Sequence, residues 1–180
     1  MLDLNRHKFI MLQILKDIYS DIEMAASLGF KGGTALMFFY GLPRFSVDLD
    51  FNLLYAEIEA KVFRKIREIA RRYGTIHDEA RKFNGIIVVV NYGRGERKLK
   101  IEISNREFND HYEIKSFMGI SMKVMVRQDM FSHKLCALLD RNVLTPRDIF
   151  DCWFFMQDKT PANTTIIEQR MKMPYVEYIQ

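Results

Sequence analysis

The sequence contains only two cysteines, Cys136 and Cys152, and they form no CxxC pair. A zinc ribbon or a disulfide scaffold needs more cysteines at closer spacing, so both are excluded and a reducing cytoplasm is the expected compartment. Long apolar runs are also missing: none approaches the roughly 20 residues that span a bilayer, so no membrane partner is expected. The first ten residues include Asp3, Arg6 and Lys8 and lack a small-residue cleavage site, unlike a signal peptide.

Neither sign of charge dominates the chain. Lys and Arg number 27 and Asp and Glu 23, which gives a net charge of +4. This weakly basic balance permits a polyanionic partner without requiring one. Internal repeats and low-complexity linkers are absent, and 48% hydrophobic with 28% charged residues is typical of a globular protein. A length of 180 residues predicts one domain, alone or with a small helical appendage.

Hydrophobic periodicity predicts helices toward both ends of the chain and strands between them. The expected helices cover residues 3–28, 35–40, 56–73, 127–141 and 146–157, with Gly29 as the C-cap of the first. The expected extended segments cover residues 30–31, 47–53, 75–82, 86–92, 98–104 and 111–125, and the end of the chain is expected to be a polar tail. This order predicts an α+β fold, with one mixed, largely antiparallel sheet flanked by helices. We expect a core over residues 1–125, on which a C-terminal helical part over 126–180 packs.

Two consecutive glycines precede the short helix predicted over residues 35–40, in the segment Lys31-Gly32-Gly33-Thr34. Glycines let a backbone approach a ligand closely, and the exposed N–H groups at a helix start can hold phosphate oxygens. An ordinary loop-to-helix turn is the alternative interpretation of this segment taken alone. With the acidic residues that follow, it is predicted to be an anion cradle.

Three carboxylates occur on predicted strands downstream of the glycines. Asp48 and Asp50 are two residues apart, so both project from the same face of their strand. Their mutual repulsion is relieved by a bound divalent cation. Glu102 lies on a later strand, and if the two strands are neighbours it completes a cluster able to hold two Mg²⁺ ions. Such a cluster beside an anion cradle suits phosphoryl or nucleotidyl transfer.

The acidic residues also allow other interpretations. Asp48 and Asp50 could belong to a solvated strand face, and Lys100 could simply pair with Glu102 across an exposed face. An EF-hand loop ending at Glu59 would place Leu53 where the sharp turn needs glycine. A dehalogenase-like Asp-x-Asp would normally open the fold and leaves the glycines unexplained. The ordered combination of motifs favours the nucleotidyl-transfer interpretation.

The motifs KGGTAL and RFSVDLD together resemble the nucleotidyltransferase fold of the DNA polymerase β superfamily. Within it, the chain is most similar to the AbiEii/AbiGii toxin family of type IV toxin–antitoxin systems. The resemblance implies a minimal nucleotidyltransferase core with C-terminal helices. The family's Gly-Gly-Thr, Arg-x-Ser and Asp-x-Asp elements match Gly32-Gly33-Thr34, Arg44 and Ser46, and Asp48 and Asp50. The residues expected to bind substrate are therefore Lys31, Gly32, Gly33, Thr34, Arg44 and Ser46.

A later stretch also resembles the family, which has a Lys-x-x-Ala-Leu helix, an arginine and then Arg-Asp-x-x-Asp. By this resemblance Lys134 contacts nucleotide phosphates, Arg141 helps to bind substrate, and Asp148 or Asp151 is the late catalytic acid. The chain ends soon after the last motif, whereas family members usually continue with more helix. The acceptor-binding part is therefore expected to be missing or reduced.

The predicted protein is a Mg²⁺- or Mn²⁺-dependent nucleotidyltransferase that moves NMP from an NTP to an acceptor hydroxyl. Asp48, Asp50 and Glu102 are the expected metal ligands, and Glu102 could instead deprotonate the acceptor. The resemblance implies an RNA acceptor, the 3′ end of a tRNA, and growth arrest that a cognate antitoxin relieves. Transfer to a protein hydroxyl and a catalytically silent nucleotide- or antitoxin-binding module stay open. Basic residues on the helix over 56–73 are interpreted as a solvated face or as a track for RNA.

Overall fold

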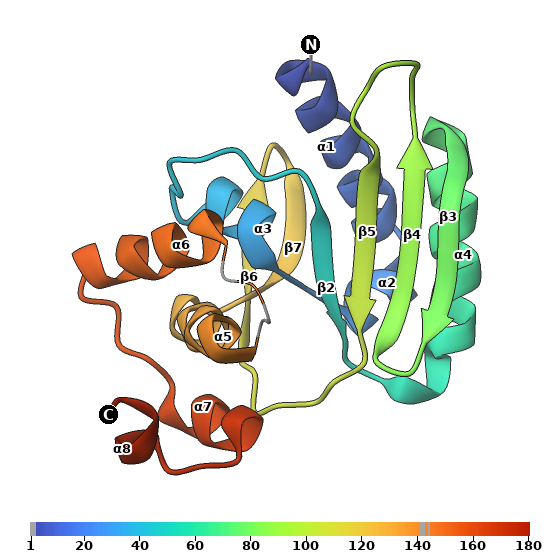
Figure 1. Ribbon diagram of the computed structural model, residues 1–180. Coiled ribbons are helices and arrows are strands. Elements are labelled where there is room, and N and C mark those ends of the chain that lie inside the picture. Colours follow the sequence, from blue (N-terminus) through green and yellow to red (C-terminus); the bar gives the residue numbers. More distant parts are fainter. Residues whose placement is uncertain (1–2, 141–142, 144) are drawn as a thin grey trace. The chain divides into compact units, whose positions relative to one another are not determined.

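The computed structural model describes residues 3–140, 143 and 145–180, which form two compact units (Figure 1). The first unit comprises Met1–Arg106 and Ile114–Val124. The second comprises Glu107–Glu113 and Met125–Gln180. Arg141, a predicted substrate-binding residue, lies outside the described residues.

A seven-stranded mixed sheet has the strand order β3-β4-β5-β2-β1-β7-β6. Strand β2 pairs antiparallel with β1 and parallel with β5, and β1 also pairs parallel with β7. The pairs β3–β4 and β4–β5 are antiparallel. The expected mixed sheet with flanking helices is therefore confirmed. The strands are β1 (Leu28–Lys31), β2 (Leu49–Leu53), β3 (Thr75–Lys82), β4 (Gly85–Asn91), β5 (Leu99–Ser104), β6 (Tyr112–Phe117) and β7 (Ile120–Met125).

Helices of the first unit pack on the sheet. The amphipathic α4 (Glu59–Tyr73), preceded by a 3₁₀ turn at Ala56–Ile58, contacts β3 and β4. Helix α1 (Leu4–Ser20) packs against α4 and α2 (Ile22–Ser27), and Figure 1 shows α1 and α4 behind the same face of the sheet. Helix α3 (Gly32–Phe39) contacts β1 and β2. Within the described residues, none of the helices is both long and apolar enough to cross a membrane.

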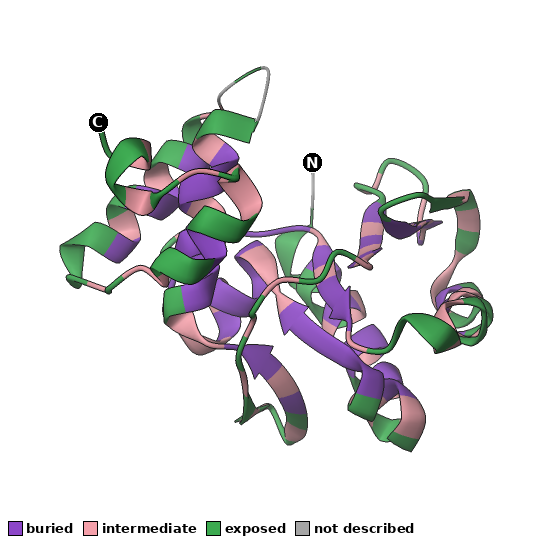
Figure 2. Ribbon diagram, turned by 90° about the horizontal axis from the view of Figure 1, so that it is seen from below, coloured by how far each residue is buried: buried purple, intermediate pink, exposed green. Residues whose placement is uncertain are grey.

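Side-chain alternation on the central strands separates the core from the polar face. Leu49, Phe51, Ile101 and Ile103 are almost completely buried, and the buried and intermediate residues alternate along strands in Figure 2. Because successive side chains of a strand point to opposite faces, the intervening polar residues of β2 and β5 share the other face. The hydrophobic core thereby fixes which face carries the acidic residues.

The second unit is helical. Its helices are α5 (Arg127–Asp140), α6 (Pro146–Gln157), α7 (Thr164–Met171) and α8 (Tyr175–Tyr178). Phe131 of α5 stacks on the fully buried Phe155 of α6, with ring centroids 5.0 Å apart. Ile166 and Ile167 of α7 are also fully buried. The expected polar tail is therefore wrong: a short helix with two buried isoleucines produces too little periodicity to be predicted.

The first predicted helix is broken, and the structure gives the reason. The Asp21 carboxylate accepts hydrogen bonds from the N–H groups of Glu23 and Met24, which starts α2 as a separate helix. Gly29 lies in β1 and does not cap the helix. The extended segment predicted over 111–125 is a hairpin of β6 and β7, whose turn contains Met118 and Gly119 with positive φ.

Replacing Asp21 with asparagine should lower stability only above acidic pH. The hydrogen bond from Lys65 Nζ, 2.6 Å from Asp21 Oδ2, lowers the pKa of Asp21 below its ordinary 3.8. A lowered carboxyl pKa gives stability that is present above pH 3.8 and is lost as the pH falls through the folded-state pKa. Asparagine keeps the helix cap but not the charge. Urea unfolding between pH 7 and pH 3 should show the difference shrinking toward acid. A difference independent of pH would contradict this assignment.

Candidate active site

Gly32 brings the predicted anion cradle against an acidic residue. Its φ is +78°, a left-handed conformation that favours glycine, and a Cβ at this position would overlap the Asp50 carboxylate. Lys31 lies directly opposite Asp50 in the antiparallel β1–β2 register. Lys31 is also the N-cap of α3, and a lysine side chain has no acceptor with which to cap first-turn N–H groups. The helix start is thus built as a donor-rich site beside a carboxylate.

Gly33 lies against the Arg-x-Ser segment. A Cβ on Gly33 would be 2.6 Å from Ser46 Oγ and 3.2 Å from an Arg44 guanidinium nitrogen. Ser46 is buried, whereas Arg44 is half-buried. The structure therefore places both predicted substrate-binding side chains against the second glycine of the cradle.

Thr34 has a different role from the one its position in the motif suggests. Its side chain is fully buried, and its hydroxyl donates a hydrogen bond of 2.5 Å to the Asp48 carbonyl. The hydroxyl therefore holds the backbone of Asp48. Any contact of Thr34 with phosphate is left to its backbone N–H.

The predicted carboxylates come from neighbouring strands. Asp50 and Glu102 are direct partners in the parallel β2–β5 register, and Asp48 precedes β2 by one residue. Burial raises the pKa of Asp50 above its ordinary value, and the charges of Glu102 and Asp48 act in the same direction. The nearby ammonium groups of Lys100 and Lys31 oppose this shift. Asp50 is consequently a carboxylate whose ionised form is disfavoured unless positive charge is close.

Lys100 lies among these carboxylates. Its Nζ is 2.7 Å from Glu102 Oε2 and 4.0 Å from Asp48 Oδ2. Burial lowers the pKa of Lys100, but the Glu102 hydrogen bond and the acidic charges outweigh it and raise the pKa. The pairing with Glu102 that the sequence left open is therefore present. The involvement of Asp48 was missed, although spacing by two from Glu102 already placed Lys100 on the acidic face.

The donor set suits a hard divalent cation, because Asp48, Asp50 and Glu102 supply only carboxylate oxygens. In the part of the chain that the structure describes, however, no three or more His, Cys, Asp or Glu side chains are arranged as a metal site. Lys100 provides the positive charge that Glu102 and Asp48 contact. The three-carboxylate metal centre stays a prediction.

Residues of the later motif meet in the second unit. Lys134 Nζ is 2.8 Å from Asp151 Oδ2, and Asp151 is fully buried. Asp148 is also buried and accepts a hydrogen bond of 2.6 Å from Thr145 Oγ1. The predicted site residues therefore form two sets, one within each unit.

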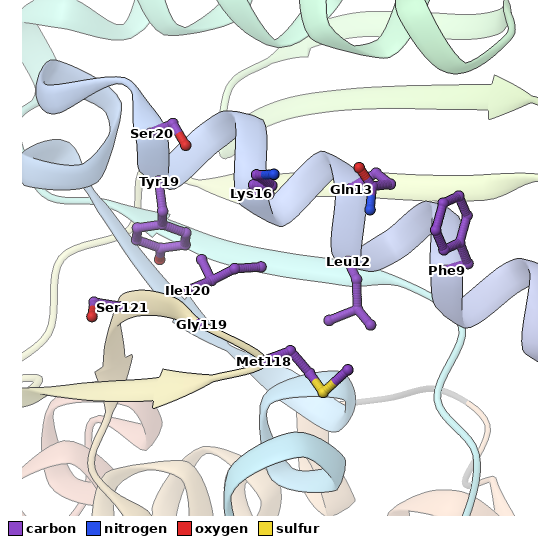
Figure 3. A pocket seen from close by; sticks show the side chains of 10 residues that line it. All are labelled: Phe9, Leu12, Gln13, Lys16, Tyr19, Ser20, Met118, Gly119, Ile120 and Ser121. Atoms are coloured by element: carbon purple, nitrogen blue, oxygen red, sulfur yellow. The ribbon is translucent and has the colours of Figure 1, made fainter.

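A separate pocket of about 600 Å³ lies between α1 and the β6–β7 turn (Figure 3). Phe9, Lys16 and Tyr19 line it from α1, and Met118 and Ile120 from the turn. Its lining includes none of the predicted site residues that the structure describes. The pocket is therefore not the acidic site.

Solved structures resemble the chain over most of its length. JHP933 from Helicobacter pylori is 25% identical, with a TM-score of 0.61 over 88% of this chain and 69% of that chain. The antibiotic-resistance factor ANT(2'')-Ia is 11% identical, with a TM-score of 0.63 over 99% and 95%. An antigenic nucleotidyltransferase-like protein from Paracoccidioides brasiliensis is 9% identical, with a TM-score of 0.56 over 89% and 86%. The last two share the fold alone. A search of curated proteins gives no match.

A family comparison extends over nearly the whole chain. The profile of the nucleotidyl transferase AbiEii toxin of type IV toxin–antitoxin systems matches residues 13–177. This span includes both sets of predicted site residues, and the resemblance inferred from the motifs is confirmed. The expected nucleotidyltransferase fold and enzyme class are confirmed with it. The chain belongs to the AbiEii nucleotidyltransferase toxin family.

Proposed function

We propose that the protein transfers NMP from an NTP to an acceptor hydroxyl and releases pyrophosphate, using Mg²⁺ or Mn²⁺. One observation carries the proposal: the glycine turn of α3 closes directly on Asp50, which is in register with Glu102. The N–H groups that we propose to bind phosphate thereby lie beside the carboxylates that we propose to bind the cation. This pairing suits a triphosphate that carries a cation.

Each residue of the acidic site has a proposed task. Asp48, Asp50 and Glu102 would hold the cation, which when bound supplies charge neutralisation and activation of the acceptor hydroxyl. The N–H groups at Gly32 and Gly33 would hold β- and γ-phosphate oxygens. If Glu102 does not bind the cation, its carboxylate would accept the acceptor's proton.

In the second unit, Lys134 is proposed to neutralise charge that develops on the leaving pyrophosphate. A flexible point charge suits this task, and the buried Asp151 holds its ammonium group in place. Asp148 or Asp151 is the proposed late acid. Both are buried and both have a side-chain partner, Thr145 for Asp148 and Lys134 for Asp151.

We propose RNA, specifically the 3′ end of a tRNA, as the acceptor, and growth arrest in the cytoplasm that an antitoxin relieves. Family membership supports the antitoxin partner and the NTP.

The basic face of α4 does not strengthen the RNA assignment. Lys61 pairs with Glu23, and Arg72 pairs with Asp17. These contacts favour the interpretation of this helix face as structural.

Label transfer tests the proposed function. The wild type and the double variant Asp48→Ala, Asp50→Ala are incubated with Mg²⁺ or Mn²⁺, each α-labelled NTP in turn, and total cellular RNA plus protein. The expected result is label in a tRNA-sized band with the wild type and none with the double variant. An Asp78→Ala variant, which changes an exposed carboxylate on β3, is the matched control and should transfer label normally.

Other outcomes of this assay distinguish the alternatives. Label in protein would support the enzyme class but contradict the RNA acceptor, and it would indicate transfer to a protein hydroxyl. No label from a chain that still binds NTP would indicate the silent binding module. Equal labelling by the wild type and the double variant would contradict the assignment of Asp48 and Asp50.

A further inference from the structure

His7 is a buried histidine that none of the proposed catalytic steps uses. It lies on α1 with no exposed surface, and both of its ring nitrogens have partners in the first unit. Nδ1 is 2.5 Å from the Tyr92 hydroxyl, and Nε2 is 2.9 Å from the Val47 carbonyl oxygen. Val47 immediately precedes Asp48. The histidine therefore connects α1 to the residue before a proposed metal ligand.

The partners define the protonation of the ring. A carbonyl oxygen can only accept, so Nε2 carries the proton that His7 donates to Val47. In the tautomer with a single ring proton, Nδ1 then accepts from the Tyr92 hydroxyl. Burial raises the pKa of Tyr92, with the charge of Glu96 acting in the same direction, and this keeps the phenol protonated. The two hydrogen bonds thus hold the ring in one orientation.

Two side-chain donors hold consecutive carbonyls around Asp48. His7 holds the Val47 carbonyl, and Thr34 holds the Asp48 carbonyl with a 2.5 Å hydrogen bond. These contacts come from α1 and α3, two helices that both precede Asp48 in sequence. Fixing both carbonyls restricts the dihedral angles of Asp48 and hence the direction of its carboxylate.

We propose that His7 and Tyr92 are positioning residues that aim the Asp48 carboxylate at the cation. This inference rests on the proposed function of Asp48. Removing a side chain that positions a metal ligand typically lowers metal affinity or activity by about 10- to 100-fold. The proposed NTP contacts at Gly32 and Gly33 do not involve the hydrogen bond between His7 and Val47. The KM for NTP should therefore stay close to that of the wild type.

The test compares His7→Leu, His7→Gln and Tyr92→Phe with the wild type. Leucine removes both hydrogen bonds, whereas the glutamine amide offers one donor and one acceptor in place of Nε2 and Nδ1. Ile14→Val is the matched control, because Ile14 is fully buried on the same helix and is not a partner of the Val47 carbonyl. Melting temperature, kcat, KM for NTP and Mn²⁺ affinity by electron paramagnetic resonance are measured for each protein.

We expect His7→Leu to lower kcat and Mn²⁺ affinity by about 10- to 100-fold. His7→Gln should recover most of this loss, and Tyr92→Phe should fall between. Ile14→Val should keep kcat and Mn²⁺ affinity despite a lower melting temperature. Histidine ¹⁵N spectra should show a protonated Nε2 and an unprotonated Nδ1 for His7 in the wild type. In Tyr92→Phe the Nδ1 resonance should shift, because Nδ1 loses its hydrogen-bond partner, while Nε2 stays bonded to the Val47 carbonyl.

Two results would overturn the inference. One is a His7→Leu variant with wild-type kcat and Mn²⁺ affinity. The other is a loss in all variants, including Ile14→Val, that simply follows melting temperature. A wild type that binds Mn²⁺ but transfers no label would contradict the proposed function alone. The Mn²⁺ affinities of the variants would still test the positioning role of His7. A wild type that binds no Mn²⁺ would overturn both.

Discussion

Replacing Asp50 with asparagine should abolish nucleotidyl transfer and leave the folded protein at least as stable as the wild type at neutral pH. Removing one carboxylate from a proposed cation site forfeits several kcal/mol of charge stabilisation, or about 10³-fold or more in rate. Stability should move the other way. Burial raises the pKa of Asp50, and Glu102 and Asp48 add repulsion, so the ionised form is costly in the folded state.

The pH dependence of stability gives the sign of this effect. A carboxyl whose folded-state pKa is raised contributes most below its ordinary pKa of 3.8, and that contribution is lost as the pH rises through the folded-state pKa. Asparagine carries no such penalty, so its advantage should grow from pH 4 toward pH 7. Urea unfolding with a chelator present measures this, and the Asp78→Asn variant is the control. A clear loss of stability at pH 7 would mean that the Asp50 carboxylate is a favourable partner in the fold.

Replacing Gly32 with alanine should cost both stability and activity. The left-handed φ of +78° costs about 1–2 kcal/mol for a residue with a Cβ. The Cβ would also overlap the Asp50 side chain, and crowding of this kind costs a further ~1–3 kcal/mol. The molecules that still fold should be inactive, because Asp50 must move and the cradle no longer closes on it.

Gly95 offers a matched control for the Gly32 prediction. Its φ is +79°, yet a Cβ there meets nothing within 4 Å. Gly95→Ala should therefore show the backbone cost alone and keep transfer activity. Urea unfolding and label transfer of the two variants separate strain from crowding. Equal losses of stability in both variants would show that the overlap with Asp50 adds nothing to the destabilisation caused by Gly32→Ala.

Local patterns were sufficient for much of the acidic site. Alternation of apolar and polar residues placed Asp50 and Glu102 on strands and set their faces, because burial of Phe51 and Ile101 leaves the intervening side chains on the opposite side. Paired glycines predicted a close backbone approach at the start of α3. The particular partner of that approach, the Asp50 side chain, was not predictable from the pattern.

Predictions failed where short segments or capping competed with periodicity. The apolar spacing from residue 3 to 28 is nearly continuous, but the Asp21 carboxylate caps a new helix and interrupts it. Helices α7 and α8 are short, and packing within the second unit supplies the stability that their own sequence lacks. In α7 and α8 tertiary contacts outweighed local propensity, whereas at Asp21 a local helix cap outweighed the apolar periodicity.

An acidic pair, a later glutamate and a glycine turn occur in the order typical of a nucleotidyltransferase, and this order is enough to predict the enzyme class. Which of these residues come together depends on pairings between distant segments. The parallel β2–β5 pairing puts Asp50 beside Glu102, and the contact of His7 with Tyr92 joins residues 85 positions apart. Such pairings depend on the packing free energy of the whole core. They cannot be predicted from a short stretch of sequence, because no short stretch contains both partners.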